Sequence, residues 1–211
     1  MSGYYKTIYN NKTSPDDVLL ADSLLSQLPT GISSNDRYPL TILSDEEKEP
    51  VPTLGREEGK YDYERLLGYY VAEERKILLL RKAIVRVAGE LEVSETGLRA
   101  VVFAHELGHY YTHLLPLWDT SSFSTDLFNS SSLGVLEGWA QLFAFWAVRY
   151  SPTHNDIFIK LLKGQSYPYH VFEQYEKNWN GKWSTLQLLH SLDNLRKLTH
   201  PTTIQDWNNC F

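Results

Sequence analysis

The chain has 211 residues, which suits one folded domain with an appended segment. Hydrophobic residues make up 42% of it, enough for a core without disulfide staples, and the single cysteine, Cys210, suggests a reducing compartment. The formal net charge of −6 argues against nucleic acid as the main partner, because phosphate binding needs clustered Lys and Arg.

The first residues carry no targeting signal that we can identify. Residues 1–12 lack an apolar core of signal-peptide length, and no stretch reaches the roughly 18 apolar residues of a membrane span. The nearest candidate, residues 133–148, is too short and carries Glu137 and Gln141. We therefore expect a cytoplasmic protein that makes no membrane contact, with an exported form as the alternative.

The N-terminal region is expected to hold one helix and then a linker. In residues 14–28, Ser14 can act as the N-cap and Pro15 fits the first helical position. Residues 29–60 are rich in Pro, Ser, Gly and acidic residues, which favours a loop or flexible linker. We accordingly divide the chain into residues 1–60 and a main domain over residues 61–211. Two interpretations of the first helix stay open: it packs on the main domain, or it is a detachable arm or pro-region.

The main domain is expected to begin with a β-hairpin. Two short runs, at residues 67–72 and 76–80, have strand composition, and residues 73–75 between them suit a turn. The strand at residues 76–80 is a candidate for pairing with an extended substrate by strand addition. A helical pattern follows at residues 81–90.

The rest of the chain is expected to be helical apart from one loop. Ser94 can cap a long helix over residues 95–115. A Ser-rich loop covers residues 120–132, and a second helix covers residues 133–150. This second helix is apolar almost all round, so it should be buried. Further helices should follow, including one over residues 184–198.

The segment His105-Glu106-Leu107-Gly108-His109 indicates a zinc site. Two histidines four residues apart on a helix point to the same side, separated by about 6 Å of rise, so both rings can reach one ion. Glu106 lies beside them, where it can act as the catalytic base that takes a proton from water. The alternative is that both histidines are ordinary core residues and that Glu106 is a surface acid.

Glu137 is the favoured third metal ligand. A catalytic zinc needs three protein ligands and an open position. Glu137 lies in the buried helix, where a carboxylate without a partner costs several kcal/mol, and a dication would remove that cost. A salt bridge to a residue such as Arg149 is the alternative. Gln141, one turn later, could accept the outer N–H of a zinc-bound histidine.

Three other residues could compete with Glu137 for this role. His113 continues the four-residue spacing, but it lies about 12 Å along the helix axis from His105, which is too far. Asp119 and Asp126 lie in the Ser-rich loop and stay possible.

The two motifs together resemble a known family. HELGH is followed after a loop by E-x-x-A-x-x-F-A, formed by Glu137, Ala140, Phe143 and Ala144. This pattern resembles minimal gluzincin peptidases, especially the ImmA/IrrE metallopeptidase family, over about residues 66–150. This chain has Gln141 where the family often has Asn or Asp.

The resemblance implies a fold and an activity. The fold would be α+β and zincin-like, with a short mixed or antiparallel sheet, an active-site helix, a glutamate helix and extra C-terminal helices. The activity would be zinc-dependent hydrolysis of a peptide or protein substrate. In that family pattern His105, His109 and Glu137 hold the Zn²⁺ and Glu106 is the general base.

A further donor is expected to stabilise the oxyanion, usually a Tyr or His. The segment QSYPYHVFEQY offers Tyr167, Tyr169, His170 and Tyr175, of which we favour Tyr169 as a catalytic residue. Two alternatives to a peptidase stay open. One is a non-catalytic zinc-binding or regulatory interaction protein, and the other is an enzyme that acts on a different amide or ester.

Overall fold

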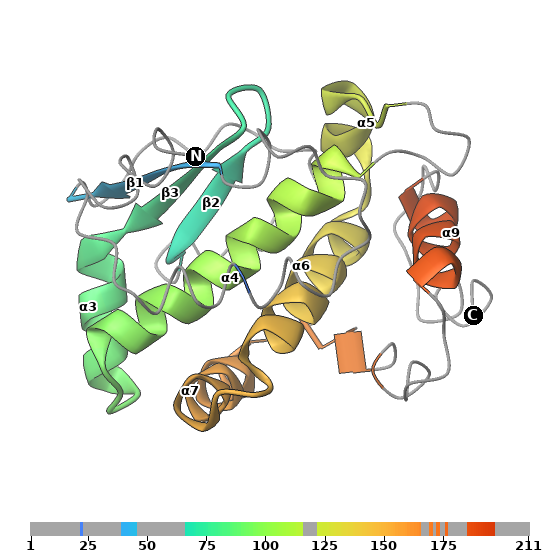
Figure 1. The fold of residues 1–211 in the computed structure, drawn as a ribbon. Helices are drawn as coiled ribbons and strands as arrows, with labels where there is room; N and C mark the ends of the chain where they lie inside the picture. The colour runs from blue at the N-terminus through green and yellow to red at the C-terminus, as the bar shows by residue number, and fades with distance from the viewer. Residues whose placement is uncertain are drawn as a thin grey trace.

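The computed structural model describes residues 39–45, 66–115, 122–165, 169–170, 172–173 and 185–196, together with Asp22 and Glu176. Within them the fold is α+β, with three strands and six helices (Figure 1). The elements are β1 (Leu40–Ser44), β2 (Gly68–Val71), β3 (Lys76–Leu80), α3 (Arg81–Glu90), α4 (Glu95–Leu114), α5 (Thr125–Ser130), α6 (Leu133–Val148), α7 (Pro152–Lys163) and α9 (Thr185–Arg196).

The sheet is mixed, in the order β1-β3-β2. Strands β2 and β3 form the expected antiparallel hairpin, with Gly68 opposite Leu79. Its turn ends at Arg75, whose φ of 50° lies in the left-handed region. Strand β1 runs parallel to β3 along the other edge, with Leu40 opposite Lys76. The mixed sheet agrees with the coarse fold class expected from the sequence.

Strand β1 corrects the expectation of a loop or linker over residues 29–60. Residues 40–44 are extended, and Thr41 and Ser44 are buried. The short apolar run Leu40–Ser44 becomes a strand because it pairs with β3, which lies 36 positions later in the register. The predicted helix at residues 14–28 falls outside the described residues apart from Asp22, which is helical. The division at residue 60 stays a prediction.

The pairing of β3 also corrects the expectation of strand addition at residues 76–80. This strand is central, because β1 occupies one of its edges and β2 occupies the other. An extended substrate therefore has no free edge of β3 to pair with. Strand β2, at the edge of the sheet, is buried along its whole length.

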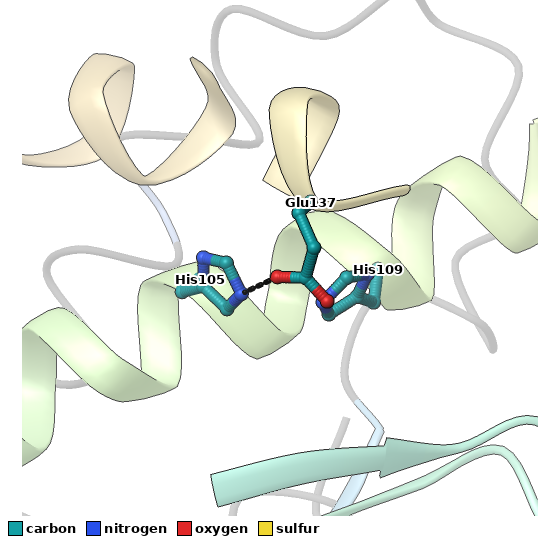
Figure 2. A group of neighbouring side chains, drawn as sticks. All are labelled: His105, His109 and Glu137. Atoms are coloured by element: carbon teal, nitrogen blue, oxygen red, sulfur yellow. Dashed lines mark hydrogen bonds and ion pairs between the residues drawn. The ribbon is translucent and has the colours of Figure 1, made fainter. Parts of the chain in front are cut away.

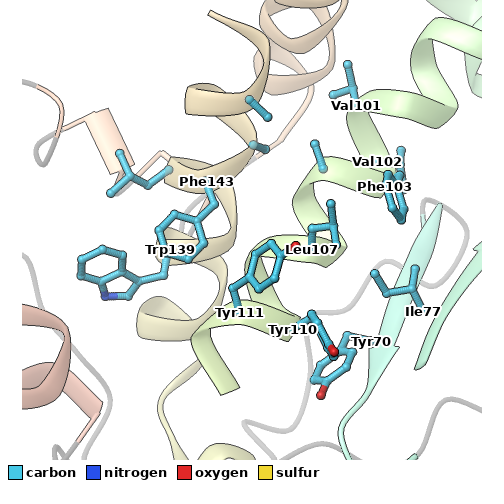
Figure 3. Packing of buried hydrophobic residues seen from close by; sticks show 14 of the residues in the cluster. Tyr70, Ile77, Val101, Val102, Phe103, Leu107, Tyr110, Tyr111, Trp139 and Phe143 are labelled. Carbon is cyan, nitrogen blue, oxygen red and sulfur yellow. The ribbon is translucent and has the colours of Figure 1, made fainter. Parts of the chain in front are cut away.

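Helix α4 forms the centre of the molecule, between the sheet and α6 (Figures 1 and 3). Its first turn is capped as expected, because the Gly97 N–H donates to Ser94 Oγ at 3.0 Å. Its own apolar side chains pack in one core with side chains from the sheet on one side and from α6 on the other. This core includes Tyr70 and Ile77 from the sheet, Phe103 and Tyr111 from α4, and Trp139 and Phe143 from α6. Any polar side chain on α4 that faces inward therefore needs a specific partner.

Helices α4 and α6 approach each other closely at one point. A methyl group on Gly108 would lie 2.6 Å from Ala140 Cα and 2.8 Å from its carbonyl oxygen. Only a residue without a side chain allows the backbones to come this near. Side chains one turn away on either helix can consequently reach across the interface.

The region before α6 differs from the expected loop over residues 120–132. A short helix, α5, occupies Thr125–Ser130, and Ser124 Oγ accepts from the Leu127 N–H at 3.2 Å. Serine is common in loops but is also a good N-cap, so the same composition fits both structures. Helix α6 begins after its own cap, Ser132, and ends at Val148, two residues before the expected end.

The C-terminal helices agree with the expectation of further helices, since α7 starts at Pro152 and α9 covers Thr185–Arg196. None of the described helices combines the length and the hydropathy that a bilayer crossing requires.

Candidate metal centre

Three side chains from two helices converge on one point (Figure 2). His105 and His109 come from α4 and Glu137 from α6, and one potential ligand atom from each lies within 4.8 Å of the others. Glu137 Oε2 is 3.1 Å from His105 Nε2, and Glu137 Oε1 is 3.6 Å from His109 Nε2. Arg149, the alternative partner of Glu137, instead places its guanidinium 4.6 Å from the centre of the Tyr150 ring. This buried group can hold a metal ion.

The second ring nitrogen of His105 has a partner on α6. His105 Nδ1 lies 2.8 Å from Gln141 Oε1, as the sequence position of Gln141 suggested. An amide oxygen can only accept, so Nδ1 carries the hydrogen and donates it. The ring is thereby oriented with Nε2 facing Glu137 and His109, which is the arrangement that metal-binding histidines need.

The charges within the group favour a cation. Burial lowers the pKa of His105, but the hydrogen bond to Glu137 and its negative charge outweigh burial and raise that pKa to about 9. Burial raises the pKa of Glu137, but the charge of His109 and the hydrogen bond from His105 outweigh it, so the pKa is lowered. Glu137 is thus a buried carboxylate at neutral pH. A metal ion would compete with the proton on His105 Nε2 and bind less tightly as the pH falls.

Glu106 lies next to the group without belonging to it. Its side chain is 4% exposed, and its Oε2 atom is buried without a hydrogen-bond partner. Burial is the main reason that the pKa of Glu106 is raised. A buried carboxylate oxygen without a partner is rare and indicates a bound water, an ion or a catalytic role.

The donor set fits zinc. Two imidazole nitrogens and one carboxylate form one of the ligand sets of catalytic zinc, which leaves a fourth position for water or substrate. The same nitrogen and oxygen donors also bind other divalent transition metals. The geometry and donor set therefore form a group that could hold a metal ion, and the identity of that metal is a separate question.

The competing ligands lie elsewhere. His113 is buried one turn beyond His109, but its Nδ1 is 2.8 Å from the Tyr70 hydroxyl and its Nε2 is 3.3 Å from Thr125 Oγ1. Asp126 is exposed on α5 and is not part of the group. Asp119 falls outside the described residues.

Tyr169, which follows α7 in the chain, lies beside the candidate metal centre. The ring centroids of Tyr169 and His105 are 6.0 Å apart, which places Tyr169 near the group, while its role in catalysis stays a prediction. His170 donates from Nε2 to the Gln165 carbonyl oxygen at 3.0 Å and contacts Glu173 Oε1 through Nδ1 at 3.0 Å. The hydrogen bond to Glu173 raises the pKa of His170. The other two candidates, at positions 167 and 175, fall outside the described residues.

Sequence reasoning did not identify Gln165. Its side-chain oxygen accepts from Gln141 Nε2 at 2.9 Å, so it is connected to His105 through one intervening residue. No motif or periodicity marks this residue, because the contact depends on how the chain returns to α6 after α7.

Comparisons with protein-family models, with curated proteins and with solved structures give no match. The resemblance to the ImmA/IrrE family therefore depends on the motif residues alone.

Proposed function

We propose that this chain is a zinc-dependent peptidase of the gluzincin type, with a zincin-like arrangement in which α4 is the active-site helix and α6 the glutamate helix. The observation that carries the proposal is the convergence of His105, His109 and Glu137 beside a buried acid, Glu106, that has an oxygen without a partner. A buried carboxylate oxygen without a hydrogen-bond partner is rare in a group that serves packing alone.

The three ligands supply two neutral donors and one negative charge to a dication. Zinc bound there would act as a Lewis acid and make water nucleophilic near neutral pH. His105 and His109 are held on one face of a buried helix, and Gln141 orients His105. The site is thus preorganised, which reduces the reorganisation that binding and catalysis require.

Glu106 would act as the general base. Burial raises its pKa, which makes the carboxylate a stronger proton acceptor than an exposed glutamate. It would take one proton from the attacking water and pass it to the nitrogen of the leaving amine. The peptide bond is then broken with no net change in the protonation of Glu106.

Tyr169 would stabilise the oxyanion that forms on the attacked carbonyl. Its ring lies near that of His105, with 6.0 Å between the ring centroids. One such hydrogen-bond donor contributes about 3 kcal/mol to transition-state stabilisation. The proposed substrate is an amide bond in a peptide or protein, in keeping with the gluzincin motif.

The proposal is tested by Glu106→Gln. This change preserves size but removes the base, so we expect hydrolysis of a fluorogenic peptide library to fall by about 10²–10⁴-fold. Zinc content, measured by mass spectrometry of the metal, should stay the same. Glu90→Gln, at an exposed glutamate on α3, is the matched control and should change neither quantity.

Two results would contradict the proposal, the first for the base and the second for the activity as a whole. If Glu106→Gln cleaves peptides as fast as the original chain, Glu106 is not the base. If the original chain binds zinc stoichiometrically and cleaves no member of the library, the non-catalytic zinc-binding protein becomes the better interpretation.

A further inference from the structure

Three segments that are distant in sequence meet in one line of hydrogen bonds behind the metal centre. His105 on α4 donates from Nδ1 to Gln141 Oε1 on α6 at 2.8 Å. Gln141 then donates from Nε2 to Gln165 Oε1 at 2.9 Å. Gln165 directly follows Gly164, the C-cap residue of α7. The line therefore connects a metal ligand to the chain after α7.

The backbone of Gln165 is held at both of its polar groups. Its N–H donates to the Leu162 carbonyl at 3.0 Å, and its carbonyl accepts from His170 Nε2 at 3.0 Å. Gln141 is only 3% exposed, so water cannot easily replace the contact between the two amides. The backbone of Gln165 is thus held in place within reach of the Gln141 side chain.

The direction of these hydrogen bonds decides whether His105 can bind a metal. A ligand nitrogen must present a lone pair, so His105 binds through Nε2 only if Nδ1 carries the hydrogen. Gln141 must therefore present its oxygen to His105, although an amide can rotate by 180° and present its nitrogen instead. If Gln141 alone rotated, its oxygen would face Gln165 Oε1 and two acceptors would meet, so Gln141 can rotate only if the Gln165 amide rotates with it.

We propose that Gln165 is a positioning residue for the metal centre, which holds the Gln141 amide with its oxygen toward His105 so that Nε2 is free for the ion. Gln165 does not touch the ion and acts only through Gln141. The inference depends on metal binding by the proposed site and does not depend on hydrolysis.

The first test compares two substitutions of similar length at one position. Gln165→Met removes the amide acceptor. We expect zinc affinity, measured by competition with a chromogenic chelator, to fall by about tenfold. This is the lower end of the roughly 10–100-fold loss that is typical when a residue supporting a metal ligand is removed. Gln165→Glu keeps an acceptor for Gln141 Nε2, so its affinity should stay within about twofold of the original chain. Equal affinities for the original chain and Gln165→Met, or equal losses in both variants, would overturn the proposal.

The second test asks whether Gln165 acts through Gln141. Gln141→Leu should lower zinc affinity by about 10–100-fold, and adding Gln165→Met to it should cause no further loss. Losses that multiply in the double variant would overturn the proposal, because they would show an independent effect. Thermal unfolding of the chelator-treated variants checks folding. A failure to cleave peptides would reject the peptidase and leave these affinities unaffected.

Discussion

Helix α4 carries buried histidines in two regions that differ in what lies opposite them. In the first region, His105 and His109 face the Glu137 carboxylate from α6. In the second region, one turn further on, His113 lies between the hydroxyls of Tyr70 on β2 and Thr125 on α5. Its ring also packs on Phe128, with 4.8 Å between the ring centroids.

The difference shows that the neighbouring element decides the role of a buried histidine, since residue type and four-residue spacing are the same throughout. Neutral hydroxyls satisfy both nitrogens of His113 and leave no negative charge to attract a cation. Its hydrogen bonds instead join β2, α4 and α5. The carboxylate of Glu137 gives the first region the charge that a metal ion requires.

Replacing one histidine in each region should give the largest difference in zinc affinity. We expect His109→Gln to weaken zinc binding by more than 100-fold, because loss of a ligand should exceed the 10–100-fold effect of losing a supporting partner. His113→Gln should leave zinc affinity within about threefold of that of the original chain, because His113 contributes to folding rather than to the site. The same change should lower the midpoint of thermal unfolding by several degrees. An equal loss of zinc in both variants would remove the distinction between the two regions.

The next largest effect should come from separating α4 and α6. Gly108→Ala places a methyl group against the Ala140 backbone, which cannot move aside without shifting α6 and Glu137. We expect a loss of about 3 kcal/mol in the free energy of unfolding, measured with urea, and weaker zinc binding.

Gly89 on α3 is the matched control for this change, because a methyl group there meets no atom within 4 Å. Gly89→Ala should raise stability by about 0.5–1 kcal/mol and leave zinc binding unchanged. The same sign of stability change in both variants would mean that the close approach of the two helices is not what Gly108 provides.

The smallest effect should come from removing one hydroxyl in the His113 region. Tyr70→Phe keeps the ring packing but leaves His113 Nδ1 without its hydroxyl partner, and we expect a loss of about 1–2 kcal/mol in the free energy of unfolding, measured with urea. Zinc affinity should not change. Tyr150→Phe, at a residue that is 75% exposed, serves as the control and should be nearly neutral. Reduced zinc binding in Tyr70→Phe would show that the two regions are coupled.

The convergence of His105, His109 and Glu137 could be predicted because most of its geometry is local. Helical spacing alone brings His105 and His109 to one side of α4, and the high cost of a buried carboxylate marks Glu137. The caps at Ser94 and the hairpin before α3 were also predictable, since short-range preferences determine them.

The features that sequence reasoning missed depend on contacts between distant segments. Strand β1 is only five residues long, and it becomes a strand through its pairing with β3. The six-residue helix α5 has the Ser-rich composition of a loop. Gln165 matters only because the chain after α7 returns to α6. In each case the local sequence has two acceptable structures, and tertiary contacts select one.

The parallel pairing of β1 with β3 limits how this chain could be activated by cleavage. If the N-terminal segment is a pro-region, a cut after Ser44 would take β1 away with it and leave the Lys76–Leu80 edge with unpaired N–H and C=O groups. Such an edge invites pairing with other chains and aggregation. A maturation cut that preserves the sheet would therefore have to fall before Leu40.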